Sequence, residues 1–434
     1  MGHQFELLIV LLGVVVAIGV LASYIRVAYP ILLVVAGLLL SLQDWAPKYE
    51  LPPEIVLFAF LPPLLYAAAF NTHWPCFRKQ LRSISLLAFG LVFFTTAVVA
   101  ILCHEVMGLP WPVGFLLGAI ISPPDAVAAT AITQRVRVPR IVATILEGES
   151  LVNDASALVA YRVALAVVGS GVFSFWDAAG QLAFVSAGGI AIGLAGAWLA
   201  SHLHRWLERT KLGDAKINIA ITLLTPFALY LPAEHLHVSG VLAVVSAGLW
   251  MGWRAERLFS RDLMIEARAV WEMLEFLLNG LIFILIGFQL HGILEDLSKS
   301  AIDIPKLLWW AFLLCSVVIV TRLAWVFPLA YVLRWLDRLI LGHGDPYPPW
   351  QSVSVVGWTG MRGVVSLAAA MAIPTGLDDL STPFPDRPVV IFLTFCVIFA
   401  TLVGQGLTLP LLIRVLKVDR IAEAEGADHE APTC

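Results

Sequence analysis

Charged residues are scarce in this chain of 434 residues, and their scarcity is the most informative property of its composition. Asp, Glu, Lys and Arg together make up 13% of the residues, whereas 60% are hydrophobic, and the mean hydropathy is +0.88. A soluble domain contains about 25% charged residues and at most about half apolar residues. So much apolar surface cannot be buried inside a soluble fold, so the composition predicts a protein that resides in lipid.

Other absences exclude several classes of function. Basic residues are neither in excess, since the net charge is −4, nor gathered into one patch, which excludes a nucleic-acid-binding surface. The five cysteines lie far apart without a CxxC pattern, so no zinc site and no cofactor are expected. An intramembrane enzyme would need a nucleophile with its base or an HExxH motif, and the apolar segments contain neither.

Apolar segments recur along the whole chain. Windows of about 19 residues identify thirteen candidate spans. The first lacks the basic n-region of a cleavable signal peptide, so we expect it to be retained as a helix. The sequence therefore predicts an all-α polytopic membrane protein, with a transmembrane domain over residues 1–420 and a short cytoplasmic tail over 421–434. The predicted spans are 5–23, 28–43, 53–70, 84–106, 112–133, 141–168, 178–204, 215–231, 237–253, 270–290, 307–333, 351–373 and 388–416.

Lysine and arginine are distributed unequally between the two sets of alternate loops. If the N-terminus faces outside, twenty of the 27 basic residues lie in cytoplasmic loops or at their edges, and only Lys48, Lys299, Lys306 and Arg387 lie opposite. Cytoplasmic loops of membrane proteins carry such an excess. The bias predicts a cytoplasmic C-terminus. The twenty are Arg26, Arg78, Lys79, Arg82, Arg135, Arg137, Arg140, Arg205, Arg209, Lys211, Lys216, Arg254, Arg257, Arg261, Arg268, Arg334, Arg338, Arg414, Lys417 and Arg420.

The thirteen segments divide into six, one linker helix at 178–204, and six more. The two halves, about 5–168 and 215–416, begin on opposite sides of the membrane, so they would form inverted repeats. The fifth segment of each half is interrupted, by Ser122, Pro123 and Pro124 in one and by Gly360 and Gly363 in the other. Pro and Gly often only kink membrane helices. Matched interruptions, however, are typical of a transporter's binding site.

Eight ionisable residues of the predicted spans are assigned to the membrane interior, away from the ends of the spans. Each costs about 2.5–3.5 kcal/mol at the centre of a membrane on insertion scales. They must therefore pair with one another, face water, or bind something charged. The eight are Asp125, Glu147, Glu149, Asp154, Arg162, Glu275, Arg322 and Arg362.

The densest polar stretch lies in the sixth span. Ser150 and Asp154 are four residues apart and share a helix face, as do Glu149 and Asn153. A carboxylate, a hydroxyl and an amide oxygen thus converge as hard ligands for Na⁺ or K⁺. The carboxylate of Asp154 can take up a proton instead of the cation, whereas Asn153 cannot. One titratable ligand implies one exchange event.

The remaining intramembrane charges have structural interpretations. Arg362 needs a buried anion, for which Glu149 is the first candidate and Glu147 the second, so we expect a structural ion pair between two helices. Asp125 is either a cation ligand or a charge that neutralises the dipole end of the opposing half-helix. Arg162, Arg322 and Glu275 lie one turn or more from the dense cluster and are interpreted as structural residues rather than cation ligands.

Five motifs together resemble one family. GESLVND at 148–154 resembles the signature of the monovalent cation:proton antiporters, in the branch of the prokaryotic sodium/proton antiporters and eukaryotic sodium/proton exchangers. The likeness extends over roughly residues 5–417. The other matching motifs are FLPPLLYAAAF at 60–70, GAIISPPDAVAAT at 118–130, LLNGLIFILIGFQL at 277–290 and GWTGMRGVVSLA at 357–368.

The resemblance implies a homodimer with an inverted-repeat fold of crossed, broken helices, which exchanges Na⁺ or Li⁺, sometimes K⁺, for H⁺ by alternating access. It makes Asp154 the residue that binds cation or proton, beside Asn153, with Ser150 as a further ligand. Glu149 and Arg362 would form the bridging pair, and Asp125 would lie in the unwound stretch. By this resemblance, Asn153 places the chain with electroneutral members.

Two positions depart from the family pattern. Many members carry an acid where this chain has Ala67, and several carry a small residue, sometimes a threonine ligand, where it has Pro124. The departures concern ion choice and affinity. The function predicted is that of an antiporter in the plasma (inner) membrane. A cation channel with a buried charged pore is the alternative, although a channel usually builds a continuous ring of ligands by oligomeric symmetry.

Overall fold

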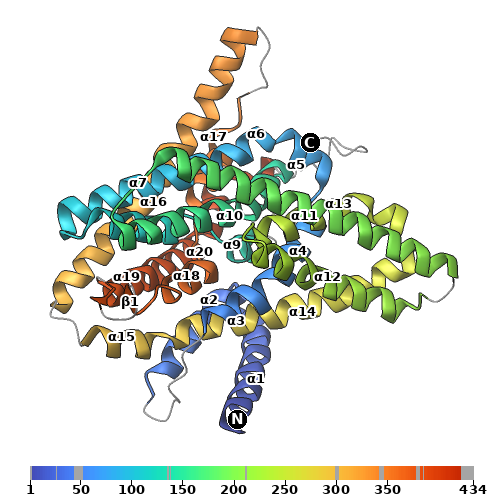
Figure 1. Ribbon diagram of the computed structural model, residues 1–434, viewed down its shortest axis with the longest axis horizontal. Helices are drawn as coiled ribbons and strands as arrows, with labels where there is room; N and C mark the ends of the chain where they lie inside the picture. Colours follow the sequence, from blue (N-terminus) through green and yellow to red (C-terminus); the bar gives the residue numbers. More distant parts are fainter. Residues whose placement is uncertain are drawn as a thin grey trace.

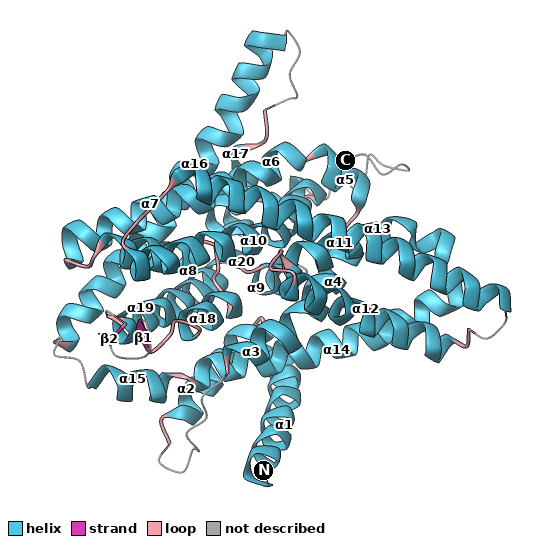
Figure 2. Ribbon diagram, viewed as in Figure 1, coloured by secondary structure: helices cyan, strands magenta, loops and turns pink. Residues whose placement is uncertain are grey.

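The computed structural model describes residues 2–25, 27–43, 52–133, 136, 138–210, 213–298, 303–341, 347–377, 382–384 and 386–421. Most of the predicted cytoplasmic tail, from residue 422 on, lies outside these ranges. The described chain is helical apart from turns and a short antiparallel pairing of β1 (Gly376–Leu377) with β2 (Thr382–Pro383) (Figure 2). The predicted all-α class is confirmed.

Helices follow one another with short connections. Four π-helical stretches continue α-helices: η1 (Val56–Phe60), η2 (Leu86–Leu91), η3 (Cys103–Met107) and η4 (Ala400–Gln405). The α-helices are α1 (Gly2–Ile25), α2 (Tyr29–Ser41), α3 (Pro53–Ile55), α4 (Leu61–Asn71), α5 (Trp74–Lys79), α6 (Leu81–Ser85), α7 (Val92–Leu102), α8 (Trp111–Ile121), α9 (Ala126–Thr133), α10 (Arg140–Ser170), α11 (Phe175–Thr210), α12 (Ala215–His235), α13 (Gly240–Leu258), α14 (Arg261–Phe288), α15 (Leu290–Ser298), α16 (Ile304–Leu341), α17 (Trp350–Trp358), α18 (Val364–Met371), α19 (Arg387–Phe399) and α20 (Gly406–Val415).

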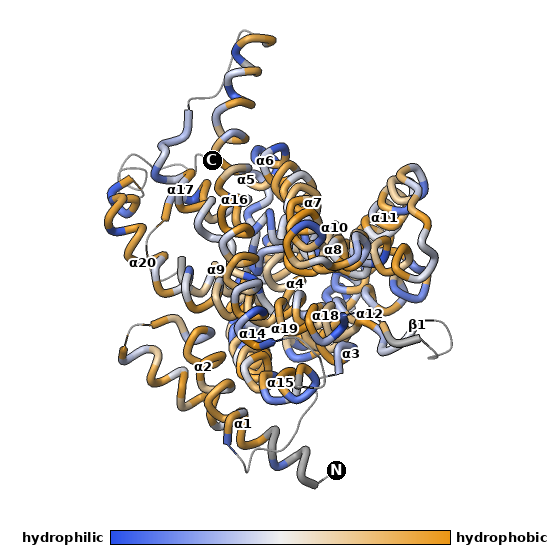
Figure 3. Tube along the Cα trace, turned by 90° about the vertical axis from the view of Figure 1, so that its left-hand side faces the viewer, coloured by the Kyte–Doolittle hydropathy of each residue, from blue (hydrophilic) through white to orange (hydrophobic). Residues whose placement is uncertain are grey.

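Every predicted span overlaps helix. In the described part of the chain, eight helices are long and apolar enough to cross a membrane, and α2 and α8 are shorter apolar helices. Hydrophobic residues run along most of α1, α2 and α7 (Figure 3). The count of thirteen spans stays a prediction. The eight long spans are Pro53–Asn71, Leu81–Met107, Arg140–Ser170, Phe175–Thr210, Ala215–His235, Arg261–Leu297, Ile304–Ile340 and Arg387–Val415.

The connections between helices gather at opposite ends of the molecule. The turns from α11 to α12 and from α13 to α14 lie at one end, on the right of Figure 1, and α15 and β1 lie at the other. Arg209 lies in the last turn of α11 at the first of these turns, and Arg261 begins α14 at the second. Two clusters of basic residues are therefore on the same side, as the alternation of charged loops requires.

Helix α10 lies in the middle of the molecule (Figure 1) and is the element around which the site is built. It packs against α8 and α9 on one side and against α4, α5, α6 and α13 on another. Ser156 ties it to a neighbouring segment, because its hydroxyl donates to the carbonyl oxygen of Ala88 in η2 at 2.5 Å. The dense polar stretch is thus held inside the bundle.

Candidate functional site

Two broken helices meet at the centre of the fold. Helix α8 ends at Ile121 and α9 begins at Ala126, while α17 ends at Trp358 and α18 begins at Val364. The backbone N–H of Asp125 donates to the carbonyl oxygen of Met361 at 2.7 Å, so the two interruptions touch. Prolines supply no N–H to continue a helix, which explains the first break.

Ser122, Pro123 and Pro124 lie in the first interruption and Gly360 and Gly363 in the second, where the sequence predicts them. Gly363 is required by a close approach: a Cβ built on it would lie 1.5 Å from Oδ2 of Asp125. The Ser122 hydroxyl donates to the carbonyl oxygen of Ala119 at 3.1 Å and so stays with its own helix.

Asp125 lies between the N-termini of two half-helices. Its Oδ1 accepts the N–H of Val127 at 2.8 Å, and its carboxylate also interacts with the backbone N–H groups of Ala128 in α9 and Val364 in α18. A negative charge stabilises a helix N-terminus. Of the two interpretations of Asp125 from sequence, this geometry favours neutralisation of the helix dipoles.

Arginines face the C-termini of the other two half-helices. Arg362 Nε donates to the carbonyl oxygen of Ile121 at 2.9 Å, at the end of α8, and its Nη1 donates to that of Gly360. Arg322, from α16, donates through Nε and Nη2 to the carbonyl oxygen of Val356 in α17, at 3.2 and 3.1 Å. Positive charge thus compensates the negative ends of both helix dipoles.

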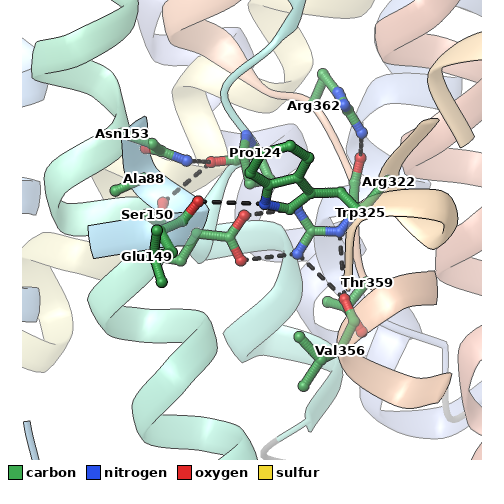
Figure 4. Close-up of polar contacts among 12 residues, drawn as sticks. Ala88, Pro124, Glu149, Ser150, Asn153, Arg322, Trp325, Val356, Thr359 and Arg362 are labelled. Carbon is green, nitrogen blue, oxygen red and sulfur yellow. Dashed lines mark hydrogen bonds and ion pairs between the residues drawn. The ribbon is translucent and has the colours of Figure 1, made fainter. Parts of the chain in front are cut away.

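The predicted partner of Glu149 is wrong. Its carboxylate pairs with Arg322, not Arg362, through two parallel bonds of 2.6 and 2.7 Å, and both side chains are 1% exposed (Figure 4). The reason is geometric: α16 brings Arg322 alongside α10, whereas backbone carbonyls take the donors of Arg362. Spacing along the chain distinguishes the two arginines poorly, because each lies alone in its span.

Ser150 and Asn153 converge on one backbone oxygen. The hydroxyl of Ser150 and the amide Nδ2 of Asn153 both donate to the carbonyl oxygen of Pro124, at 3.1 and 3.2 Å (Figure 4). Sequence reasoning missed this oxygen because it looked for ligand side chains, and a backbone carbonyl has no sequence signature. The departure at position 124 therefore leaves a carbonyl oxygen in the site.

Asp154 lies buried beside this group, 6% exposed, and close enough to Asp125 for the two carboxylates to interact electrostatically. Within the described residues no hydrogen bond or ion pair engages its carboxylate. The Oδ1 atom of Asn153 is likewise buried without a partner there. Unengaged carboxylate and amide oxygens, with a hydroxyl and a carbonyl beside them, are the hard ligands that alkali cations take.

The other singled-out residues lie around the site. Ala67 is buried in α4, so no acid comes from that position. Arg162 pairs with Glu234 of α12, with Nη2 and Oε2 2.8 Å apart, a partner that sequence reasoning did not identify. Glu275 is half-buried in α14.

Comparisons with known proteins identify the family of this chain. The family described as sodium/hydrogen exchanger, transmembrane, matches residues 8–415. The sodium, potassium, lithium and rubidium/H⁺ antiporter of Bacillus subtilis (strain 168) is 32% identical over 415 residues, which cover 94% of this chain but 61% of that protein. The Na⁺/H⁺ antiporter NhaS2 of Synechocystis sp. is 31% identical, over 96% of this chain and 71% of its own length.

A solved structure shares the fold. The sodium proton antiporter MjNhaP1 from Methanocaldococcus jannaschii superposes with a TM-score of 0.67 at 22% identity, covering 95% of this chain and 98% of that one. At this identity the likeness concerns the fold alone. The family resemblance drawn from the motifs is confirmed.

Proposed function

Because the chain belongs to the sodium/hydrogen exchanger family, we propose that it is a secondary antiporter that exchanges a monovalent cation for H⁺ by alternating access. The observation that carries the proposal is the buried carboxylate of Asp154, which has no partner among the described residues and lies beside two crossed broken helices. An intramembrane acid without a counter-charge is functional by default. Such crossings are where transporters bind their substrates.

Asp154 would hold the cation in one half-cycle and a proton in the other. Ser150 Oγ, Asn153 Oδ1 and the carbonyl oxygen of Pro124 would complete the ligands for Na⁺, Li⁺ or K⁺. Glu149 and Arg322 hold α10 against α16, and Arg362 and Asp125 stabilise the helix ends. With one titratable carboxylate as ligand, exchange would be electroneutral.

The setting of this activity is part of the same proposal. The members of the family are integral membrane transporters. The family match gives no support to a cation channel, which was the alternative from sequence. We infer a homodimer in the plasma membrane with the C-terminus in the cytoplasm, on the strength of the basic loops and the family resemblance. The inverted repeats over 5–168 and 215–416 remain a prediction.

Purified protein in proteoliposomes tests the function. Adding Na⁺, Li⁺ or K⁺ to one side should move protons in the opposite direction, followed with an internal pH dye. The flux should saturate with cation concentration, as expected for a carrier. Cation flux that proceeds without any coupled proton movement would reject the antiporter and favour the channel.

A further inference from the structure

One face of α10 carries a second acid in line with the first. The helix runs unbroken from Arg140 to Ser170. Along it Glu147, Leu151, Asp154 and Leu158 follow one another at spacings of four, three and four residues, so their side chains share a face. Seven residues separate the two acids, which is two turns, or about 10 Å along the helix axis.

An apolar layer separates the two acids on that face. Leu151 is 1% exposed and belongs to a hydrophobic cluster with Leu65 and Tyr66 of α4 and Val245 of α13. Leu158 packs against the same cluster beyond Asp154. In this structure, an ion at Glu147 would have to cross packed side chains to reach Asp154.

Glu147 is a half-buried carboxylate that lacks a partner among the residues that the structure describes. Within the described residues it makes no hydrogen bond and no ion pair, although it lies between Arg140 and Asp154 on the same helix. The next residue, Gly148, packs against Phe77 of α5 and Ile84 of α6, which places Glu147 beside the loop that the sequence assigns to the cytoplasm. The basic side chains of those elements, Arg78, Lys79 and Arg82, are exposed.

We infer that Glu147 is a second cation-binding residue, which holds an entering monovalent cation on the cytoplasmic side of the apolar layer before it passes to Asp154. The inference rests on the proposed antiport function. A partly desolvated carboxylate raises the local concentration of cations and the rate at which they arrive. The ligand is a hydrated Na⁺ or K⁺, because a single carboxylate can replace only part of a hydration shell. Glu147 delivers cations to the transport site and does not itself carry a proton or a cation across the membrane.

The test compares Glu147→Gln and Glu147→Asp with wild type in everted membrane vesicles, whose outer surface is the cytoplasmic face. Glu272→Gln is the matched control, because Glu272 is an acid of α14 whose side chain is 71% exposed. Glu147→Gln should raise the apparent KM for Na⁺ by about threefold to tenfold, with the maximal rate within about twofold of wild type. Glu147→Asp and Glu272→Gln should keep the wild-type KM.

Ionic strength supplies an independent measurement on the unaltered protein. Choline chloride should raise the wild-type KM towards that of Glu147→Gln, because salt screens the carboxylate. A wild-type KM that is insensitive to choline chloride overturns the inference, even if Glu147→Gln does not fold.

Three further results overturn the inference. The first is an unchanged KM for Na⁺ in folded Glu147→Gln. The second is an equal loss of maximal rate in the Gln and Asp variants, which would indicate a structural role. The third is a changed ratio of charges moved per cycle, which would make Glu147 a proton carrier. Wild-type protein without cation-dependent proton flux would instead refute the proposed function.

Discussion

Removal of the Arg322 side chain should destabilise the protein more than any other single change to the buried charges. Its guanidinium makes two bonds to Glu149, at 2.6 and 2.7 Å, and two to the carbonyl oxygen of Val356, at 3.1 and 3.2 Å, with 1% of the side chain exposed. In Arg322→Ala the carboxylate of Glu149 stays buried without a partner, which costs about 3–5 kcal/mol in soluble proteins. The carbonyl left unpaired at the end of α17 adds about 1–3 kcal/mol.

The assay is thermal unfolding of detergent-purified protein, together with the yield of monodisperse protein. Arg268→Ala is the matched control, because Arg268 lies 3.8 Å from Glu272 with 74% of its side chain exposed, and exposed pairs contribute about 0–1 kcal/mol. Glu149→Gln combined with Arg322→Gln should recover part of the stability, since no buried charge is then left alone. A double variant as unstable as the sum of the two single variants would refute the partnership, and so would wild-type stability in Arg322→Ala.

Five other predictions concern transport and topology. Asp154→Asn should fold normally and abolish cation-dependent proton flux, because the shared ligand loses its charge; near-wild-type flux would place the site elsewhere. Gly363→Ala should abolish activity or folding, because its Cβ would collide with the carboxylate of Asp125, whereas Gly404→Ala, with open space around it, should behave as wild type. Imposing a membrane potential with K⁺ and valinomycin should leave Na⁺-driven exchange unchanged, although each net charge moved would be worth about 2.3 kcal/mol per 100 mV; a rate that follows the potential would reject one-for-one exchange. Lowering the pH should raise the apparent KM for Na⁺, because protonated Asp154 cannot ligate the ion. Reporters fused after Arg420 and between α14 and α16 should report opposite sides of the membrane, and a shared side would contradict the thirteen-span topology.

Hydropathy and backbone chemistry were sufficient to predict the helices and their breaks. Every apolar window overlaps helix in the structure, because lipid demands continuous apolar helix, and the missing N–H groups of Pro123 and Pro124 marked the first interruption. Pairing between distant helices was not predictable in the same way. Both Arg322 and Arg362 are single charges in apolar spans, and only the three-dimensional path of α16 decides which one meets Glu149.

The carbonyl oxygen of Pro124 illustrates a second limit of sequence reasoning. Ligand searches consider side chains, whereas this oxygen belongs to the backbone and is present whatever residue occupies the position. Its location depends on the break between α8 and α9, which brings the chain towards α10. The position of the break was predictable, but the direction in which its carbonyl points was not.

The two hydrogen bonds to that oxygen also bear on how a cation would bind in the proposed antiporter. Ser150 and Asn153 both donate to the carbonyl oxygen of Pro124, so this backbone acceptor is satisfied inside the helix bundle. In the proposed cycle, a cation bound to that oxygen would compete with these two donors for its lone pairs. Because Nδ2 of Asn153 is engaged in one of these bonds, Oδ1 of the same amide is the atom left without a partner among the described residues, and it is the atom that the proposed cation would meet.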